Sequence, residues 1–571
     1  MVVVALWSGC TDEDRPGSTG VDPGEPVELV ERGVQECATP GTRSSAGPFE
    51  RRFSLVPAPY DPWIWHGGIT AADLNGDDLL DVVVALEQGL ELYEGTTDLS
   101  FPTRGQAVFG AFDLSFASGA TVADYDADGD LDLYVMRVAG DPAPEWSETN
   151  GYGKNRLLQN QGDGTFVDVT DAAGGVDGCG VHQRTGDYGC WKSMTSSWGD
   201  IDGDQDLDLY VGNYGYVDET DGTTQEEMES AEPDFLYLNN GDGTFTDASN
   251  RLPIELREGY TYAGGWFDLD DDGDLDLYTV NDFGNFWPNR VLWNNGTGQF
   301  GFQSTDPSGL DQSMTGMGLG VGDLNGDGRP DLVMPVWQHV LVYESRTSGV
   351  WIDVSQNVGI YEPAEEQHVP WGTELGDLDN DGDLDVITQF GFVKNDNSEW
   401  SNGRAQPDAL YLNDSTWSDD GVSYTLTDVA AAWGVADTGM SRGAVLADLN
   451  RDGWLDLGKR ILNNHLSILE SENAVYLSNC GSEGWLEVAL AQPGTPNTFA
   501  VGAKVTIEAG GRQYTRTLHA GGTGYASQPP PELHFGLGDA SRIDLLTVRW
   551  PDGAVSRLED IDTRQRIAIS R

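Results

Sequence analysis

A nine-residue phrase, repeated seven times with small changes, constrains this chain more than any other feature. An acid or amide stands at its first, third, fifth and ninth places. The copies read DLNGDDLLD, DYDADGDLD, DIDGDQDLD, DLDDDGDLD, DLNGDGRPD, DLDNDGDLD and DLNRDGWLD, and they begin at residues 73, 124, 200, 268, 323, 377 and 448. Alternate residues of a tight loop aim their side chains at one point, and Ca²⁺ prefers about six to eight oxygen ligands. The phrase therefore predicts a calcium loop used as a repeat unit.

In each copy, the side chains at places one, three, five and nine and the backbone carbonyl at place seven are the predicted ligands of one Ca²⁺ ion. These residues are Asp73, Asn75, Asp77, Leu79 and Asp81; Asp124, Asp126, Asp128, Asp130 and Asp132; Asp200, Asp202, Asp204, Asp206 and Asp208; Asp268, Asp270, Asp272, Asp274 and Asp276; Asp323, Asn325, Asp327, Arg329 and Asp331; Asp377, Asp379, Asp381, Asp383 and Asp385; Asp448, Asn450, Asp452, Trp454 and Asp456. We expect up to seven structural ions, because nearly identical sites in every repeat cannot all be catalytic.

The residue at place twelve excludes an EF-hand, whose loop needs a bidentate glutamate there. The residues at that place are Val84, Val135, Val211, Thr279, Met334, Thr388 and Lys459. A short β-type run follows place nine instead, as in LDLYV at 131–135. Each loop is therefore expected to join two strands.

The spacing of the copies predicts a β-propeller. They begin roughly 50 to 75 residues apart, which suits one four-stranded blade each. A small residue, such as Gly68 or Gly119, stands five places ahead of the first acid, as expected for strands crowded around an axis. The segment FERRFSLVPAP at 49–59 reads as the missing fourth strand of the last blade, beside NAVYLSN at 473–479. We predict an all-β fold, with a seven-bladed β-propeller over 48–483 and a small β domain over 484–571.

The repeats resemble FG-GAP/VCBS repeats, and the end of the chain resembles the ASPIC/UnbV domain of the cartilage acidic protein family. The matching phrases are GWLEVAL at 484–490, VGAKVTIEAGG at 501–511, GGTGYASQ at 521–528, HFGLGDA at 534–540 and VRWPDG at 548–553. Two loops depart from the glycine usual at place six, with Asp78 and Gln205. Aspartate tolerates a left-handed backbone better than glutamine, so the third loop is expected to bind calcium least well. The resemblance implies a role in binding or adhesion.

Charge and the first residues indicate where the protein works. The net charge is −64, from 95 acids and 31 bases, which excludes nucleic acid and anionic membrane surfaces as partners. The segment MVVVALWSGC at 1–10 resembles a bacterial lipoprotein signal with Cys10 as the lipid-bearing residue, and a flexible acidic linker is expected over 11–47. We predict export to the periplasm or cell surface as an outer-membrane lipoprotein, with secretion as the alternative. A lipid at Cys10 is the one membrane contact expected.

The remaining four cysteines form two predicted disulfides. Cys179 and Cys190 bracket an insertion, and Cys37 is expected to bond Cys480 beside the last blade. Such bonds suit an oxidising compartment. A zinc site that includes His182 is the alternative reading of the first pair, although its cysteine spacing is wider than zinc sites prefer.

Catalytic motifs are missing from the sequence: it contains no GxSxG, HExxH, Walker loop or GxGxxG after a strand. His66, Tyr262, Trp371 and Arg442 lie near the starts of the innermost strands and could face a ligand funnel at the ring's mouth. Three functions remain open. One is a binding or adhesion module for a glycan or an extracellular protein, and the second is a calcium-supported polysaccharide-active enzyme with a funnel His or Tyr as its base. The third is a passive surface scaffold. Binding without turnover is the preferred interpretation.

Overall fold

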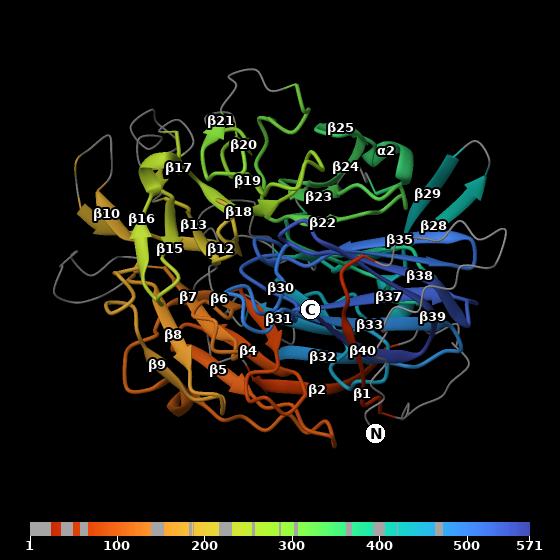
Figure 1. Cartoon of the computed structure of the whole chain (residues 1–571). Helices are drawn as coiled ribbons and strands as arrows, with labels where there is room; N and C mark the ends of the chain where they lie inside the picture. The colour runs from red at the N-terminus through yellow and green to blue at the C-terminus, as the bar shows by residue number, and fades with distance from the viewer. Residues whose placement is uncertain are drawn as a thin grey trace.

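The computed structural model describes residues 24–35, 49–57, 67–138, 153–181, 186, 188–215, 231–253, 257–284, 287–301, 307–360, 368–391, 406–418, 421–462 and 472–571. Strands joined by turns make up most of them, which confirms the all-β class (Figure 1). The signal segment 1–10 with Cys10, and also Cys37, His66 and His182, lie outside the described residues.

Seven antiparallel sheets follow one another along the described chain and surround a common centre in Figure 1. They are β3 (Ile69–Ala72), β4 (Asp81–Leu86) and β5 (Gly89–Tyr93); β6 (Ala117–Ala123), β7 (Asp132–Arg137), β8 (Arg156–Asn160) and β9 (Phe166–Asp168); β12 (Ser193–Gly199), β13 (Asp208–Asn213), β15 (Phe235–Asn239) and β16 (Phe245–Asp247); β18 (Thr261–Phe267), β19 (Asp276–Asn281), β20 (Arg290–Asn294) and β21 (Phe300–Gly301); β22 (Gly320–Gly322), β23 (Asp331–Val336), β24 (His339–Thr347) and β25 (Val350–Asp353); β26 (Pro370–Gly376), β27 (Asp385–Phe390), β28 (Ala409–Ser418) and β29 (Gly421–Asp428); β30 (Met440–Ala447), β31 (Asp456–Leu462), β32 (Glu472–Ser478) and β2 (Phe49–Pro57).

The first and last of these sheets meet. Strand β3 contacts β6 on one side and β30 on the other, so the row of sheets returns to its start. Strand β2 pairs antiparallel with β32, from Phe49 opposite Ser478 to Pro57 opposite Glu472. This pairing confirms the predicted clasp, in which a strand that precedes the first loop completes the last sheet. We interpret the seven sheets as the seven predicted blades.

Several shorter elements lie between these strands along the chain. They are the 3₁₀ turns η1 (Gln106–Phe109) and η3 (Ser249–Arg251), the helices α2 (Ser355–Val358) and α3 (Ala430–Trp433), and the strand pairs β10 (Cys179–Val181) with β11 (Tyr188–Cys190) and β14 (Glu232–Pro233) with β17 (Glu258–Gly259). A disulfide joins Cys179 to Cys190 across the first of these pairs, as predicted. Cys480 is also disulfide-bonded. No helix among the described residues is long and apolar enough to cross a membrane.

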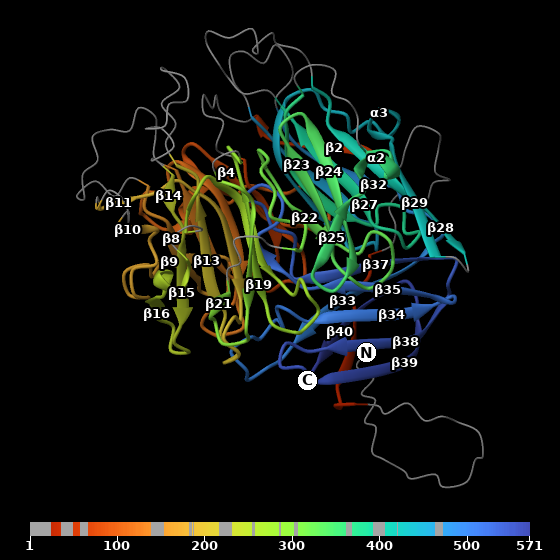
Figure 2. The ribbon, with the colours of Figure 1, turned by 90° about the horizontal axis from the view of Figure 1, so that it is seen from above.

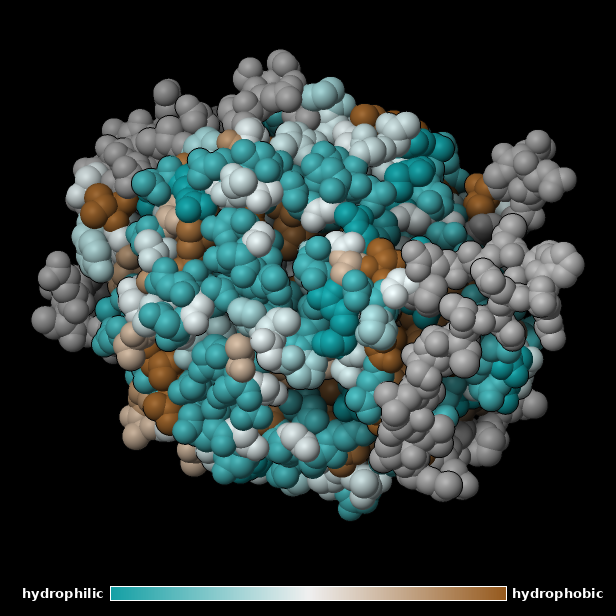
Figure 3. Space-filling view, viewed as in Figure 1, coloured by the Kyte–Doolittle hydropathy of each residue, from teal (hydrophilic) through white to brown (hydrophobic). Residues whose placement is uncertain are grey.

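The tail domain, residues 484–571, contributes three strands to one sheet and all four strands of a second, with one apolar core between them. Its strands are β33 (Gly484–Ala491), β34 (Lys504–Ala509), β35 (Arg512–Thr517), β36 (Ala520–Gly521), β37 (Glu532–Gly538), β38 (Arg542–Arg549), β39 (Val555–Asp562) and β40 (Gln565–Ser570). Figure 2 shows this domain along one side of the ring. The face of the molecule that is turned toward the viewer in Figures 1 and 3 is mainly hydrophilic.

One sheet of the tail domain includes a strand from the N-terminal part of the chain. Strand β1 (Glu28–Arg32) pairs antiparallel with β40, and Leu29 packs against the tail core. The expected flexible linker over 11–47 is therefore wrong for this stretch. By pairing with β40, strand β1 covers an edge of the tail sheet that would otherwise be exposed.

A loop of the tail domain fills the centre of the ring. This insertion loop, residues 520–530, adds β36 to the edge of β12 and forms isolated bridges from Gly524 to Leu319 and from Gln528 to Thr70. A Cβ atom on Gly119 would lie 2.1 Å from the carbonyl oxygen of Ala526. The small residues ahead of the loops are thus explained by the insertion loop, and not by crowding among the blades alone.

Four asparagines on third strands tie neighbouring sheets together. Asn160 Nδ2 donates to the Leu74 carbonyl of the preceding loop at 2.8 Å and to the Leu131 carbonyl of its own loop at 3.0 Å. The equivalent residues are Asn239, Asn294 and Asn413, each bonded to place two of a preceding loop and place eight of its own. The sequence signal was the Asn after each of the runs LLQ, LYL, LW and LYL, whose meaning the sequence analysis missed.

We predict that Asn160→Ala lowers the free energy of unfolding by about 1–3 kcal/mol, because two buried carbonyls lose their donor. Urea unfolding of the full chain measures this change. The neighbouring Gln161→Ala is the matched control. Gln161 is exposed, and within the described residues its side-chain amide donates to the carbonyl oxygens of residues 159 and 160. Equal effects of the two substitutions would contradict the role of Asn160.

Candidate metal centres and the interdomain face

Each nine-residue loop folds around its own first aspartate. In the second loop, the backbone turns left-handed at Ala127 (φ 61°) and Gly129 (φ 97°). The carboxylate of Asp124 accepts the N–H groups of Asp128 at 3.1 Å and Gly129 at 3.0 Å. These bonds curl the chain so that alternate side chains face inward, as the spacing predicted.

The carboxylates converge in four of the loops. Within the described residues, groups whose ligand atoms lie within 4.8 Å of one another are Asp124, Asp126 and Asp132; Asp200, Asp202 and Asp208; Asp268, Asp270 and Asp272; Asp377, Asp379 and Asp385. Loops one, five and seven carry an asparagine at place three, whose side-chain oxygen accepts the N–H of place five at 3.0 Å. The predicted carbonyl ligands at place seven stay a prediction.

Three carboxylate oxygens show that these clusters suit a cation. The Oδ1 atoms of Asp126, Asp202 and Asp268 are buried, and none has a hydrogen-bond partner among the described residues. Burial raises the pKa of Asp268 to about 6. Burial also raises that of Asp124 to about 6, and its neighbours Asp128 and Asp126 act in the same direction. Buried carboxylate oxygens without a hydrogen-bond partner are costly, so the donor set fits a hard metal ion.

The aspartate at place nine has a second role that the sequence analysis missed. Asp132 accepts the N–H of Tyr125 in its own loop at 3.3 Å and the N–H of Asn160 on the third strand at 2.8 Å. The same two bonds recur at Asp81, Asp208, Asp276, Asp331, Asp385 and Asp456. This residue therefore joins the loop to the sheet.

The two unusual residues at place six keep the loop geometry. Asp78 and Gln205 are left-handed, with φ of 69° and 75°. The N–H of Gln205 bonds Asp200 Oδ2 at 2.9 Å, as a glycine does elsewhere. Glutamine therefore leaves the third loop able to form its acid cluster, and its weaker calcium binding stays a prediction.

Side chains of the tail domain reach the acidic loops. Lys504 Nζ lies 3.0 Å from Asp271 in the fourth loop, and Arg512 lies 3.3 Å from Asp383 in the sixth. The Thr498 hydroxyl donates to Asp124 in the second loop. The loops are thus covered by a domain whose cationic side chains offset part of their negative charge.

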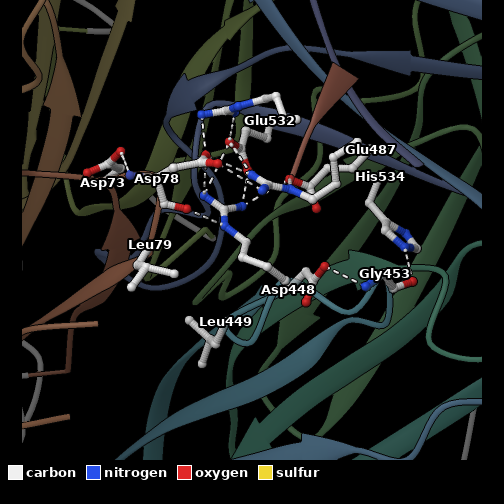
Figure 4. A network of polar contacts seen from close by, with 12 residues as sticks. Asp73, Asp78, Leu79, Asp448, Leu449, Gly453, Glu487, Glu532 and His534 are labelled. Atoms are coloured by element: carbon white, nitrogen blue, oxygen red, sulfur yellow. Dashed lines mark hydrogen bonds and ion pairs between the residues drawn. The ribbon is translucent and has the colours of Figure 1, made fainter. Parts of the chain in front are cut away.

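A buried network of arginines and acids connects this domain to the ring where the first and last sheets meet (Figure 4). Glu487 Oε1 accepts from Arg451 and from Arg566, both at 2.9 Å. Arg566 also reaches Asp78 at place six of the first loop, at 3.0 Å. Arg32 on β1 pairs with Glu532 at 2.7 Å and also with Asp78.

The arginines of this network govern the charge of Glu532. Burial by itself raises the pKa of this carboxyl, but Arg451, a hydrogen bond with Glu487 and Arg32 together lower it to about 2. The network explains why place six of the first loop is Asp78 and not the usual glycine. The Asp78 carboxylate pairs with arginines of the network. Removing one member of such a buried network leaves an unpaired charge, which is strongly destabilising.

A cavity of about 560 Å³ lies between the tail domain and the ring, with Glu374, Arg516, His519 and His534 in its wall. The side chain of Glu374 is buried, and its Oε1 atom has no hydrogen-bond partner in the described part of the chain. Burial raises the pKa of Glu374 and lowers the pKa of His519 and of His534 to about 4. The uncharged forms of these three groups are therefore favoured.

Comparison with known families agrees with these observations. Residues 73–135, 200–279 and 268–334 match the FG-GAP-like repeat, and residues 494–571 match the ASPIC and UnbV family. These matches identify FG-GAP-like repeats within residues 73–334 and an ASPIC and UnbV domain at residues 494–571. The match to the FG-GAP repeat ends at residue 334, yet the sixth and seventh loops have the same fold: Gly382 and Gly453 donate to Asp377 and Asp448 at 2.8 and 2.7 Å.

The chain is also similar to whole proteins. Cartilage acidic protein 1 of Mus musculus is 24% identical over 525 residues, which is 88% of this chain and 73% of the relative. The Homo sapiens protein is 24% identical over 527 residues, 88% of this chain and 71% of the relative.

Two solved structures match the chain at low similarity. An Agrocybe aegerita lectin that recognises non-reducing terminal N-acetylglucosamine has a TM-score of 0.36 and 17% identity, covering 65% of this chain and 83% of its own. The V. cholerae biofilm matrix protein Bap1 has a TM-score of 0.30 and 11% identity, with 90% and 76% covered.

The expected funnel residues of this FG-GAP-repeat protein surround a tyrosine of the tail domain. Tyr262, Trp371 and Arg442 are at most 2% exposed. The ring of Tyr525 lies 6.0 Å from that of Tyr262 and 5.7 Å from that of Trp371, and the Arg442 guanidinium lies 3.8 Å from the Trp371 ring. In this structure these side chains face the insertion loop and not solvent, so their contact with a ligand stays untested, as does that of His66.

We predict that Tyr525→Ala lowers the free energy of unfolding by about 3–5 kcal/mol, because it leaves a cavity among packed aromatic rings. Tyr525→Phe should change it little, since the Tyr525 hydroxyl has no hydrogen-bond partner among the described residues. Urea unfolding of both variants tests the claim that the insertion loop holds the ring through apolar packing. An alanine variant as stable as the wild type would contradict it.

Proposed function

We propose that this FG-GAP-repeat protein is an exported, calcium-loaded binding or adhesion module for a glycan or an extracellular protein. The observation that carries the calcium part is the set of orphaned carboxylate oxygens at Asp126, Asp202 and Asp268, each inside a loop of converging acids. A divalent cation satisfies such oxygens and removes the repulsion among the carboxylates. FG-GAP-like repeats over much of the chain support the binding role.

Calcium in this proposal is structural. Each ion would bind in the loop that connects the first two strands of a sheet. In the second, third and sixth loops, places one, three and nine would supply its side-chain ligands. Binding to the folded chain alone stabilises it by about 1.4 kcal/mol per site at tenfold saturation. Weak sites are filled in a compartment with near-millimolar calcium, which suits an exported protein.

The proposed ligand surface is the end of the sheets that faces away from the acidic loops. Half-buried aromatic side chains gather there: Trp191 precedes β12, Phe283 and Trp287 follow β19, and Trp337 follows β23. They pack on the aromatic cluster that contains Tyr262, Trp371 and Tyr525. Flat aromatic faces with solvent access suit sugar rings and protein side chains. Because Tyr525 fills the layer beneath them, we place the ligand on these outer rings.

Export has independent support. The disulfide between Cys179 and Cys190 suits an oxidising compartment, and the relatives include cartilage acidic proteins. The Cys37–Cys480 bond and the lipid anchor at Cys10 extend this proposal, because Cys37 and Cys10 lie outside the described residues.

We predict that calcium raises the melting temperature of the chelated protein and that EDTA lowers it again. Asp126→Ala should reduce the calcium-dependent rise, because it removes a predicted ligand of the second loop. Asp163→Ala, in an exposed turn of the same sheet, is the matched control and should leave the rise unchanged. Differential scanning calorimetry at fixed ionic strength measures all three. An identical melting temperature with calcium and with chelator in demetallated protein would contradict the calcium proposal.

We predict that a glycan-array screen of the calcium-loaded protein finds ligands whose binding weakens by about 0.5–1.5 kcal/mol in Trp337→Ala, through loss of an aromatic face. Ile352→Ala removes an exposed apolar side chain from β25 and should leave binding unchanged. Product analysis on each hit separates binding from turnover. Loss of binding in the Ile352 variant alone would place the ligand elsewhere, and a depolymerised glycan would move the protein to the enzyme class.

A further inference from the structure

One repeat carries a lysine where the other six carry an apolar side chain or threonine. Lys459 stands at place twelve of the seventh copy, on β31, and its side chain is 0% exposed. The strand belongs to the seventh sheet, but the lysine reaches toward residues that precede and follow the outer strands of the sixth. A buried ammonium there is costly, so its partners decide what it does.

Two carboxyl groups meet the amine. Lys459 Nζ lies 2.8 Å from Asp408 Oδ2 and 3.1 Å from Asp437 Oδ2, and it also donates to the Val435 carbonyl. The side chain of Asp408 is 1% exposed and that of Asp437 is 17% exposed. The Tyr476 hydroxyl donates to Asp437 at 2.5 Å. The amine therefore has one carboxyl beside it that is sealed from water and a second at the edge of the cluster.

Two other lysine ion pairs, those of Lys154 and Lys504, are more exposed and involve one carboxylate each. Lys154 lies 2.7 Å from Asp177, but its side chain is 27% exposed. Lys504 and Asp271 are 23% and 46% exposed. Neither lysine has a second carboxylate within ion-pair distance in the described part of the chain. Lys459 thus combines close approach, exclusion of water and a second acid that can move a proton.

We propose that Lys459 and Asp408 join in an intramolecular isopeptide bond, with Asp437 as the group that transfers the proton. Holding amine and carboxyl in contact replaces a bimolecular encounter and supplies much of the rate of such a reaction. Exclusion of water favours the amide, because water is the leaving group and the reagent of the reverse reaction.

The step balances without an added reagent. The ammonium proton passes to the Asp408 carboxylate along the 2.8 Å hydrogen bond, which leaves an uncharged amine and a carboxylic acid. The Nζ lone pair attacks Cγ of Asp408 to form a tetrahedral adduct. Asp437 removes a proton from the nitrogen and returns it to a hydroxyl of the adduct, and that hydroxyl leaves as water. An amide between Nζ and Cγ remains, and Asp437 is unchanged.

The charged pair is the resting state of the cluster. Burial raises the pKa of Asp408 to about 6, although Lys459 acts in the opposite direction. Burial lowers the pKa of Lys459, but Asp408 and Asp437 outweigh this effect and raise it. The reaction therefore proceeds through a minor form in which the proton has moved from Lys459 to Asp408 within the cluster.

The bond would fasten the ring beside its closure. Asp408 precedes β28 of the sixth sheet and Lys459 lies on β31 of the seventh, so a covalent link would span residues 51 apart in sequence. Cross-links of this kind restrict the unfolded chain, as a disulfide does.

Mass spectrometry of the full chain tests the proposal. After reduction of the disulfides, the intact wild-type mass should fall below the sequence mass by one water. Tryptic digestion should give one branched peptide containing Asp408 and Lys459 and no cleavage after Lys459. Cleavage after Lys154 in the same digest is the internal control, since that ion pair is partly exposed.

Two variants separate the roles. Lys459→Met should have its full sequence mass. Asp437→Asn should keep Lys459 and Asp408 together but retain the water, and its digest should show cleavage after Lys459. A wild-type protein of full sequence mass with Lys459 in a linear peptide would overturn the proposal. A branched peptide in the Asp437 variant would overturn the role given to Asp437.

Discussion

The ninth residue of every loop is the constraint on which this structure depends. Its buried carboxylate accepts one N–H from its own loop and one from the third strand of its sheet, and this pair of bonds recurs in all seven described loops. Four asparagines extend the connection to the preceding loop. The same geometry places several carboxylates side by side at one end of each sheet, so the architecture concentrates negative charge on one face of the ring.

The rest of the molecule is arranged to offset that charge. The tail domain lies against the acidic face, with Lys504 and Arg512 on the loops and Arg566 and Arg451 in a buried network with Asp78. Its insertion loop enters the ring and packs Tyr525 against Trp371. Bound cations would complete this compensation where carboxylate oxygens still lack a partner. The basic side chains of the tail domain and the bound cations would thus both offset the negative charge of the loops.

Much of this fold was predictable from the sequence because the repeat is local. The nine-residue phrase predicts the loops and the strands on either side, and the segment at 49–59 predicts the clasp formed by β2. Three carboxylates converge in four of the seven loops, as the spacing predicts. The Cys179–Cys190 bond was also predictable, since its partners flank one short insertion. Each of these features depends on residues near one another or on a repeated pattern.

Contacts between distant segments were not predictable in the same way. The pairing of β1 with β40 and the entry of residues 520–530 into the ring join parts of the chain hundreds of residues apart, and no periodicity marks them. The expected funnel side chains Tyr262, Trp371 and Arg442 were correctly placed near the axis, but the sequence did not indicate that Tyr525 covers them. The small residues at the axis leave room for this segment, but the sequence analysis attributed them only to crowding among the innermost strands.

Anomalous diffraction from crystals of the full chain grown with calcium would locate each ion independently of the protein atoms. If the acidic loops hold cations beneath the tail domain, we expect anomalous peaks among Asp124, Asp126 and Asp132 and in the equivalent places of the third and sixth loops, with the insertion loop inside the ring. Loops without anomalous density at saturating calcium, with carboxylates paired only to side chains such as Lys504 and Arg512, would contradict this role of the loops.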